Sequence, residues 1–319
     1  MPFNYKDALI CDMVVPWEPQ VGNGVPLLER FHAAGVTFVS VHPAGDRHGT
    51  IEALERIARA KADILSNPGR FVLVNSVADI EAAKDRGLLA VGLHLEGSNP
   101  FEGDPSRVED FYDAGVRFVH PVFNRANAFG GGSADLEDIG LTAFGAKCIE
   151  AMDKLGILSD GAHTGRRTTL EMMRVSKLPV LLSHAGCDAV FSHYRNFTDE
   201  QIVACAQTGG VVGISGANNY LGGDPTPDLI FRHVDHVARL VGPAHVGIGF
   251  DTVLDTDFLN AFVRERPDEW RGTWMPWRIA VPETIPAFAD LLAKKGYVEV
   301  DIAGIMGGNW LRAGSVWKS

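Results

Sequence analysis

The chain has little cysteine and few basic residues. Only 4 of its 319 residues are cysteines, and no two have the CxxC spacing of thiolate zinc sites. We therefore expect buried free thiols rather than disulfides or a sulfur-ligated metal. Lys and Arg number 29 against 40 Asp and Glu, which gives a formal net charge of -11. That balance argues against a nucleic-acid or anionic-membrane partner, because both require a basic surface.

Two kinds of segment are also missing from the sequence. No apolar run reaches the roughly 18 residues of a membrane span, and the start MPFNYKDALICDMVV does not resemble a secretory leader. We therefore expect a soluble, cytoplasmic protein. No GxGxxG follows the first strand-like run, which weighs against a doubly wound, dinucleotide-binding sheet.

Strand-like and helix-like runs alternate along the chain. Apolar, β-branched runs predict strands at 8–13, 36–42, 89–96, 117–122, 157–163, 179–184, 210–215 and 245–251. Such alternation is typical of an α/β fold with a closed (βα)8 TIM barrel, and a doubly wound sheet is the main alternative. Residues 71–76 are a candidate ninth strand. We expect residues 1–319 to form a single barrel domain.

Amphipathic stretches separate the predicted strands, and several end in glycine, as helices often do. The clearest are 26–35, 106–115, 141–156, 198–209 and 228–242. The segment 252–282 differs in composition, because it is rich in Arg and Pro and contains Trp270, Trp274 and Trp277. We expect a long aromatic loop there, where a lid or dimer contact would lie. Packing or a homodimer interface is the favoured role of its tryptophans, ahead of recognition.

Four residues of metal-ligand types each follow an apolar run. Glu96, His163, His184 and Asp251 end the segments AVGLHLE, ILSDGAH, PVLLSH and HVGIGFD. In a parallel barrel the carboxyl ends of the strands meet at one mouth, so these residues can gather around a metal ion. The pattern predicts a hydrolytic metalloenzyme.

The order of these segments resembles the membrane (renal) dipeptidase family of zinc peptidases, peptidase family M19. The resemblance runs from DALICDMVVPW near the start to GGNWLR at 307–312, and its most specific part is SDGAH followed by LLSHA. It implies a (βα)8 barrel with two zinc ions. Carried over by position, Glu96 would bridge the ions, His163 and His184 would complete one site, and Asp12 and Asp251 would belong to the other.

Three positions depart from the family pattern. Ile10 stands where the family has a histidine ligand, and Gly249 stands where it has the first of two aspartates. By its spacing from Glu96, Phe123 falls on the histidine that stabilises the oxyanion in the family. The second site then keeps only carboxylates, which suit Mg²⁺ or Mn²⁺ better than Zn²⁺. We expect that site to be weak, empty or filled by another metal.

The chemistry of single residues adds to the resemblance. Two imidazoles and a carboxylate match zinc sites that leave one position open for water. With an empty second site, Asp251 is free to act as the general base, whereas Asp12 and Asp251 have a second interpretation as partners of a histidine N–H. The resemblance implies that Arg195 holds the substrate carboxylate, and a solvated surface cation is the alternative. His42, His94 and His120 are candidates for replacement ligands or for barrel packing.

These observations predict a metal-dependent amidohydrolase of the dipeptidase type that binds one or two Zn²⁺ ions. Its catalytic residues would be Glu96 and Asp251, and its substrate a small molecule with an amide bond and a free carboxylate. A related hydrolase with a non-dipeptide substrate is a second interpretation. A third is a non-catalytic barrel that binds a small ligand or a partner subunit. Metal analysis together with a dipeptide screen separates the three.

Overall fold

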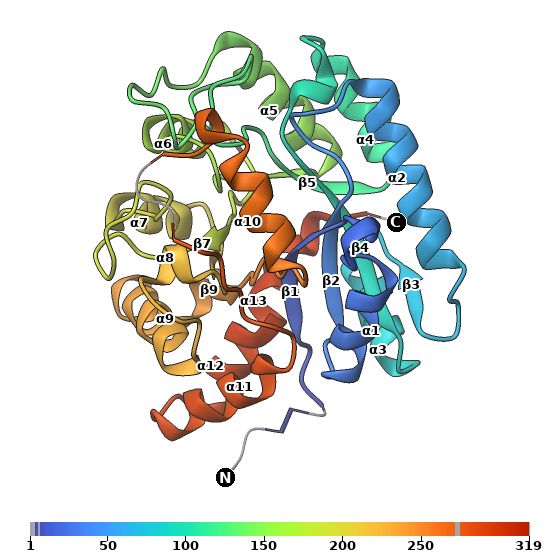
Figure 1. Cartoon of the computed structure of the whole chain (residues 1–319), viewed down its shortest axis with the longest axis vertical. Coiled ribbons are helices and arrows are strands. Elements are labelled where there is room, and N and C mark those ends of the chain that lie inside the picture. Colours follow the sequence, from blue (N-terminus) through green and yellow to red (C-terminus); the bar gives the residue numbers. More distant parts are fainter. Residues whose placement is uncertain (1–3, 6, 272–274, 319) are drawn as a thin grey trace.

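The chain folds as a barrel of parallel strands surrounded by helices (Figure 1). The computed structural model describes residues 4–5, 7–271 and 275–318, so Trp274 lies outside the described residues. Within that part of the chain the predicted (βα)8 architecture is confirmed. The barrel strands are β1 (Cys11–Pro16), β2 (Phe38–His42), β4 (Leu89–Glu96), β5 (Val116–His120), β6 (Leu158–Ser159), β7 (Leu182–Ala185), β8 (Val212–Ile214) and β9 (Val246–Ile248).

Strand neighbours follow the order of the chain. Strands β1, β2, β4, β5 and β6 form one parallel sheet, and β7, β8 and β9 form another. A parallel bridge between Asp160 and Leu181 joins the end of β6 to the start of β7. The backbone N–H of Phe250, just after β9, donates to the Asp12 carboxylate in β1. These contacts bring the two sheets into one ring, whose carboxyl ends share a mouth.

The candidate ninth strand forms outside the ring. β3 (Phe71–Leu73) pairs with the first half of β4, where Phe71 lies opposite Leu89. β5 pairs with the second half of β4, from Leu93 onward. β3 therefore lies beside the amino-terminal half of β4, and β5 lies beside its carboxyl-terminal half. Because the mouth is at the carboxyl ends of the strands, β3 does not contribute to it.

Helices begin where the sequence provides capping side chains. Ser76 and Asp79 form a capping box at α3, Thr198 and Gln201 form one at α7, and Thr142 caps α5. The helices are α1 (Val25–Ala33), α2 (Thr50–Leu65), α3 (Val77–Asp85), α4 (Val108–Asp113), α5 (Ala143–Leu155), α6 (Arg166–Val175), α7 (Asp199–Gln207), α8 (Asn218–Leu221), α9 (Pro227–Val241), α10 (Thr256–Arg264), α11 (Thr284–Lys294), α12 (Glu299–Ala303) and α13 (Asn309–Ala313).

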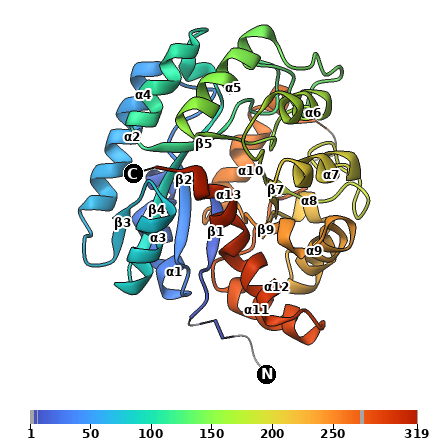
Figure 2. The same ribbon diagram turned by 180° about the vertical axis from the view of Figure 1, so that it is seen from behind.

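The segment 252–282 is not a loop throughout, so that expectation is wrong in part. It contains α10, whose first turn is capped because the Asp255 side chain accepts from the Phe258 N–H at 2.9 Å. Apolar residues three and four positions apart give this helix one apolar face, and that periodicity outweighs the Trp- and Pro-rich composition around it. Helix α10 lies on the near side of the strands in Figure 1 and on the far side in Figure 2.

The hydrophobic core lies between the strands and the outer helices. Side chains of the central strands are buried on both faces, as expected of a parallel sheet covered by helices. On the side shown in Figure 2, α13 packs against β9, where Asn309 Nδ2 donates to the Val246 carbonyl and Trp310 Nε1 to the Ile248 carbonyl. No helix among the described residues has both the length and the apolar character needed to cross a membrane.

Candidate metal centre

Three predicted ligands meet at the mouth of the barrel. Glu96 is the last residue of β4, His184 lies in β7, and His163 follows β6. One ligand atom from each lies within 4.8 Å of the others. His163 Nε2 is 3.3 Å from Glu96 Oε1 and 2.9 Å from His184 Nε2. Residues far apart in the chain therefore form one compact group of two imidazoles and a carboxylate.

Hydrogen bonds at the opposite ring nitrogens orient both imidazoles. His163 Nδ1 is 2.8 Å from Asn124 Oδ1, and His184 Nδ1 is 2.9 Å from Ser183 Oγ. With the proton on Nδ1, each imidazole directs the lone pair of its Nε2 toward the other. Two lone pairs at 2.9 Å repel each other, and a cation between them removes the repulsion. The donor set therefore fits a metal ion such as Zn²⁺.

Ser183 belongs to a buried polar group behind His184. Its Oγ is within hydrogen-bond distance of His120 Nε2, at 2.8 Å, and the same nitrogen lies 3.3 Å from Asp160 Oδ2 without forming a hydrogen bond to it. A hydroxyl oxygen has two lone pairs, so Ser183 can accept from both imidazoles. His120 Nδ1 lies 4.0 Å from Glu96 Oε1, beyond hydrogen-bond distance. In this arrangement His120 supports His184 from behind.

Three site residues have backbone conformations that residues with a Cβ usually avoid. The φ angle is 58° at Asn124, 65° at His163 and 59° at Asp251. Among the described non-glycine residues, Glu102 is the other one with positive φ. Such conformations cost about 1–3 kcal/mol each and gather at functional sites, where the surrounding structure holds them in place. The fold thus keeps strained backbone at the centre of the mouth.

The loop after β2 fixes the backbone of Glu96. The Asp46 N–H donates to the Glu96 carbonyl at 3.0 Å, and the Glu96 N–H donates to the Ala44 carbonyl at 3.1 Å. A Cβ atom at Gly45 would lie 2.0 Å from the Glu96 carbonyl oxygen. Glycine is therefore required at position 45 for this close approach.

Burial controls the charge of the three ligands. It raises the pKa of Glu96 well above its ordinary value, and the Asp251 carboxylate raises it further. Burial lowers the pKa of His163 and of His184 well below the ordinary value, and the Arg195 guanidinium adds to the effect. Both imidazoles are consequently neutral near pH 7, the form that binds metals.

Asp12 and Asp251 lie outside this group of three. Asp12 Oδ1 accepts from the backbone N–H of Phe250 at 2.9 Å and of Val14 at 3.3 Å. Its Oδ2 is buried and has no hydrogen-bond partner among the described residues. Burial raises the pKa of Asp12 to about 7 and that of Asp251 to about 6. One oxygen of Asp12 thus binds the backbone that follows β9.

The two remaining barrel histidines differ in their surroundings. His94 Nδ1 is 2.9 Å from Ser40 Oγ, and its ring stacks on Phe118 with centroids 4.3 Å apart. His42 Nδ1 lies 3.7 Å from Glu96 Oε2, and burial lowers the pKa of His42 to about 3. His94 therefore packs inside the barrel, whereas His42 faces the metal centre.

Arg195 is buried beside His184, so its interpretation as a solvated surface cation is wrong. It is 2% exposed, and its Nη2 is 3.2 Å from His184 Nε2 and 3.3 Å from the His184 carbonyl oxygen. The guanidinium also lies over the Tyr220 ring, 5.1 Å from the centroid. Arg195 therefore lies beside one of the candidate metal ligands.

Phe123 covers one side of the His163 imidazole. The two rings stack with centroids 4.5 Å apart and planes at 27°. The Arg47 guanidinium lies 4.9 Å from the centroid of Phe123 and 4.4 Å from that of Phe262 in α10. A cation thus lies next to the ring at the position where the resemblance implies a histidine.

A pocket of about 430 Å³ opens over these residues and is the right size for a small molecule. Glu96, His163 and Asp251 line it from the barrel, and Phe258 and Phe262 line it from α10.

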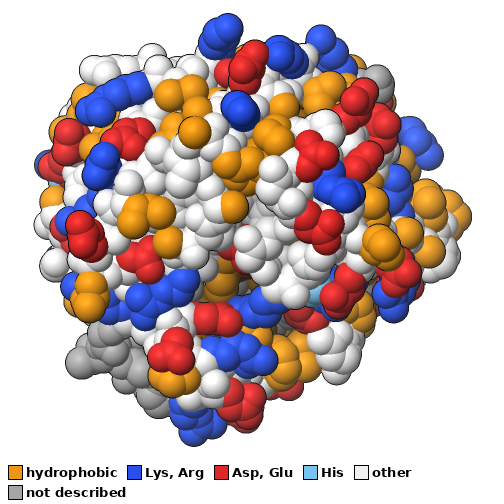
Figure 3. Space-filling view, turned by 90° about the horizontal axis from the view of Figure 1, so that it is seen from above, with side chains coloured by type: hydrophobic (Ala, Val, Ile, Leu, Met, Phe, Trp, Pro, Cys, Tyr) orange, Lys and Arg blue, Asp and Glu red, His pale blue; other side chains and the backbone are white. Residues whose placement is uncertain are grey.

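The face seen in Figure 3, from above Figure 1, carries acidic and basic side chains mixed with apolar ones. That face therefore lacks the single-sign surface that a polyanion would require.

Sequence reasoning did not assign roles to Asn124, Ser183, Asp160 and Arg47. Asn124 directly follows Phe123, and Ser183 directly precedes His184. Asp160 lies three residues before His163 in SDGAH. This closeness to selected residues was an available signal. For Arg47 the sequence carries no such signal, because the loop after β2 brings it to the mouth through tertiary contacts.

Known proteins are similar to this chain in sequence and in fold. The family described as membrane dipeptidase (peptidase family M19) matches residues 27–259. An uncharacterised protein from the pqqA 5' region of Klebsiella pneumoniae is 29% identical over 83% of this chain and 96% of its own length. An uncharacterised dipeptidase of Schizosaccharomyces pombe is 31% identical over 75% of this chain and 55% of its own length.

Solved structures agree with the sequence matches. An amidohydrolase from Pseudomonas aeruginosa superimposes with a TM-score of 0.88 at 27% identity, covering 98% of each chain. A metallopeptidase from Rhodobacter sphaeroides, liganded with a phosphinate mimic of the dipeptide L-Ala-D-Ala, has a TM-score of 0.79 at 20% identity and shares the fold. It covers 98% of this chain and 100% of its own. With the family match over most of its length, this chain belongs to the membrane dipeptidase family, peptidase family M19, and is a metal-dependent hydrolase of the dipeptidase type.

Proposed function

We propose that the metal is one tightly bound Zn²⁺, held by Glu96, His163 and His184. The observation that carries this proposal is the cluster of their ligand atoms within 4.8 Å, in which the two Nε2 atoms are 2.9 Å apart. A second ion is disfavoured because Ile10 offers no ligand atom, and Asp12 keeps only Oδ2 for a metal while its Oδ1 accepts from backbone N–H groups. Glu96 is then a terminal ligand, and a second site of Asp12 and Asp251 stays weak or empty.

The proposed reaction is hydrolysis of an amide bond. When bound, the ion supplies a water of lowered pKa and polarises the amide carbonyl. Asp251 takes the proton from the attacking water as the new C–O bond forms, and it passes this proton to the amine as the C–N bond breaks. Arg195 holds the carboxylate of the substrate, since a guanidinium pairs well with a carboxylate. Asn124 and Ser183 keep both imidazoles in their metal-binding orientation.

The proposed substrate is a small amide with a free carboxylate, and ordinary dipeptides are expected to be poor substrates. Dipeptidase names among the relatives and the dipeptide mimic bound to the R. sphaeroides protein support a dipeptide-like molecule. Phe123 favours a second candidate, a hydrolase acting on a modified amino acid or a lactam. A phenyl ring cannot donate a hydrogen bond to the developing oxyanion.

We further infer a cytoplasmic homodimer without a nucleic-acid partner. The four cysteines are free and buried, which suits a reducing compartment. The net charge of -11 disfavours polyanions. The expectation of a dimer comes from the aromatic composition of 252–282, and size-exclusion chromatography with light scattering tests it.

Metal analysis together with a dipeptide screen tests the proposal. Elemental analysis of protein purified without added metal should find close to one zinc per chain, and Asp12→Asn should leave that content unchanged. Two fully occupied ions in anomalous density would contradict the single-ion proposal. A metal-loaded protein that hydrolyses no dipeptide but does hydrolyse another amide would support the second candidate.

A further inference from the structure

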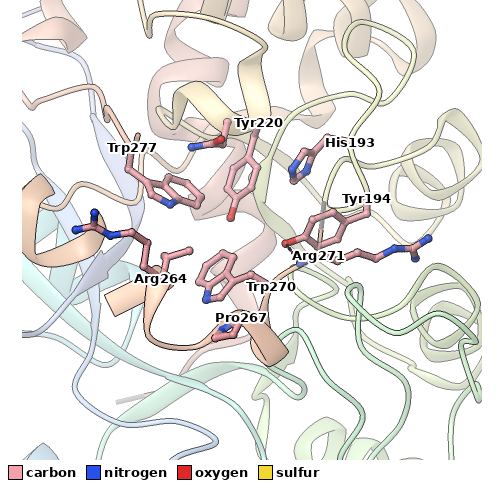
Figure 4. Close-up of a pocket in the computed structure, with 10 residues that line it drawn as sticks. His193, Tyr194, Tyr220, Arg264, Pro267, Trp270, Arg271 and Trp277 are labelled. Carbon is pink, nitrogen blue, oxygen red and sulfur yellow. Dashed lines mark hydrogen bonds between the residues drawn. The ribbon is translucent and has the colours of Figure 1, made fainter. Parts of the chain in front are cut away.

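A second hollow adjoins the active-site pocket. It has a volume of about 220 Å³, and Figure 4 shows aromatic rings on several sides of it. Three of its residues, Tyr220, Trp270 and Trp277, also line the 430 Å³ pocket above the metal ligands. We call this hollow the aromatic side pocket. Its rings are those of His193, Tyr194, Tyr220, Trp270 and Trp277.

The rings of the side pocket support one another. Trp277 meets Tyr220 at 5.4 Å with planes at 81°, and it meets Trp270 at 5.6 Å with planes at 68°. His193 lies 4.5 Å from Tyr194 and 5.4 Å from Tyr220. Edge-to-face and tilted pairs at these distances are favourable, so the walls are preorganised. Preorganised aromatic walls favour a flat, apolar ligand.

The polarity of the side pocket fits an uncharged ring. Arg264 and Arg271 line it, but Figure 4 shows their guanidinium groups pointing away from the space between the rings. No carboxylate is among the described lining residues, which disfavours a cationic ligand. The indole Nε1 atoms of Trp270 and Trp277 are buried without a hydrogen-bond partner in the described part of the chain. Buried donors are normally paired, so an acceptor group that the substrate carries beside its ring would complete them.

The size of the side pocket also fits a ring. Its volume of about 220 Å³ exceeds the 150 Å³ of an apolar cavity, in another protein, that is known to bind benzene. We propose that the aromatic side pocket binds an aromatic side chain of the substrate, so that the enzyme selects amides carrying a ring next to the scissile bond. The selection of ring-bearing amides for hydrolysis rests on the proposed function. The binding of the ring in the side pocket does not.

Ligand pairs that differ by one ring test the proposal without any turnover. Isothermal titration of the metal-loaded protein with 3-phenylpropionate and with propionate should show the phenyl compound binding about ten- to a hundredfold more tightly. Kinetic assays of Ala-Phe and Ala-Ala should show a matching preference in kcat/KM. Equal affinity of the wild-type protein for both acids would overturn the proposal.

Variants locate the ring. Val263 lines the side pocket but not the larger pocket and is 4% exposed, so Val263→Phe should fill the space and abolish the preference. Val300→Phe makes the same change at a site that is 75% exposed and should retain the preference. Tyr194→Ala removes one wall without adding bulk, and it should weaken binding of the phenyl compound if Val263→Phe fails to fold.

The outcomes separate the two proposals. If Val263→Phe and Tyr194→Ala are both folded by circular dichroism and both keep the preference for 3-phenylpropionate, the side pocket is not the ring site. If wild type and variants follow the expected binding pattern but no dipeptide is hydrolysed, the side pocket stands and the dipeptidase assignment fails.

Discussion

The two sides of the barrel mouth use their carboxylates differently. On the side of β4 to β7, Glu96 faces two imidazoles whose outer nitrogens contact Asn124 and Ser183. On the side of β1 and β9, Asp12 accepts from two backbone N–H groups instead. Two carboxylates at strand ends of one barrel mouth therefore have different surroundings. What distinguishes the two sides is that two imidazoles lie next to the carboxylate of Glu96, whereas Asp12 uses one oxygen for backbone N–H groups and its Oδ2 has no described partner.

The largest loss of metal and activity should come from the side of β4 to β7, where the two imidazoles lie. We expect His184→Ala to abolish both bound metal and turnover, because it removes one of three protein ligands. Elemental analysis and an activity assay measure the two losses. His236→Ala, a change of the same kind at an outer helix, should retain both. Retention of stoichiometric metal in His184→Ala would show that the ion lies elsewhere.

A substitution on the side of β1 and β9 should reduce the rate of turnover but not the metal content. We expect Asp251→Asn to reduce turnover by about 10²–10⁴-fold, the usual cost of losing a positioned base. The ion should remain with Glu96, His163 and His184. A turnover within a few-fold of wild type would exclude Asp251 as the base, and loss of the ion would make it a ligand.

A substitution at Phe123 should increase activity rather than reduce it. A histidine at this position can donate to the oxyanion, and one such donor is worth about 10²–10³-fold in turnover. We therefore expect Phe123→His to raise the rate of ordinary dipeptide hydrolysis. An unchanged rate with fold and metal intact would mean that the pocket serves another substrate. Efficient hydrolysis of simple L-dipeptides by the native protein would contradict the argument directly.

The smallest effect should come from the group behind His163. Removing such a hydrogen-bond partner typically weakens metal binding by about 10–100-fold, so we expect this loss for Asn124→Ala in competition with a chelator. Asn124→Asp keeps an acceptor oxygen and should restore much of the affinity. Equal losses in both variants would show that the acceptor oxygen of residue 124 does not contribute to metal affinity.

The sequence by itself determined the barrel and the three candidate metal ligands that lie together in the structure. Apolar, β-branched runs that alternate with helix-like stretches predict the eight barrel strands, and the carboxyl end of each parallel strand reaches the same mouth by geometry. Glu96, His163 and His184 could be predicted for that reason. Helix α10 was missed because a Trp- and Pro-rich composition concealed its short apolar periodicity.

Only the tertiary structure decided how the side chains at the mouth are used. The hydrogen bond from the Phe250 N–H to Asp12 Oδ1 depends on how β1 lies against the end of β9. No local sequence pattern encodes that arrangement. The burial of Arg195, the approach of Arg47 and the aromatic side pocket likewise depend on loops and on α10. Such contacts join residues distant in the chain, so their physical origin is packing rather than spacing.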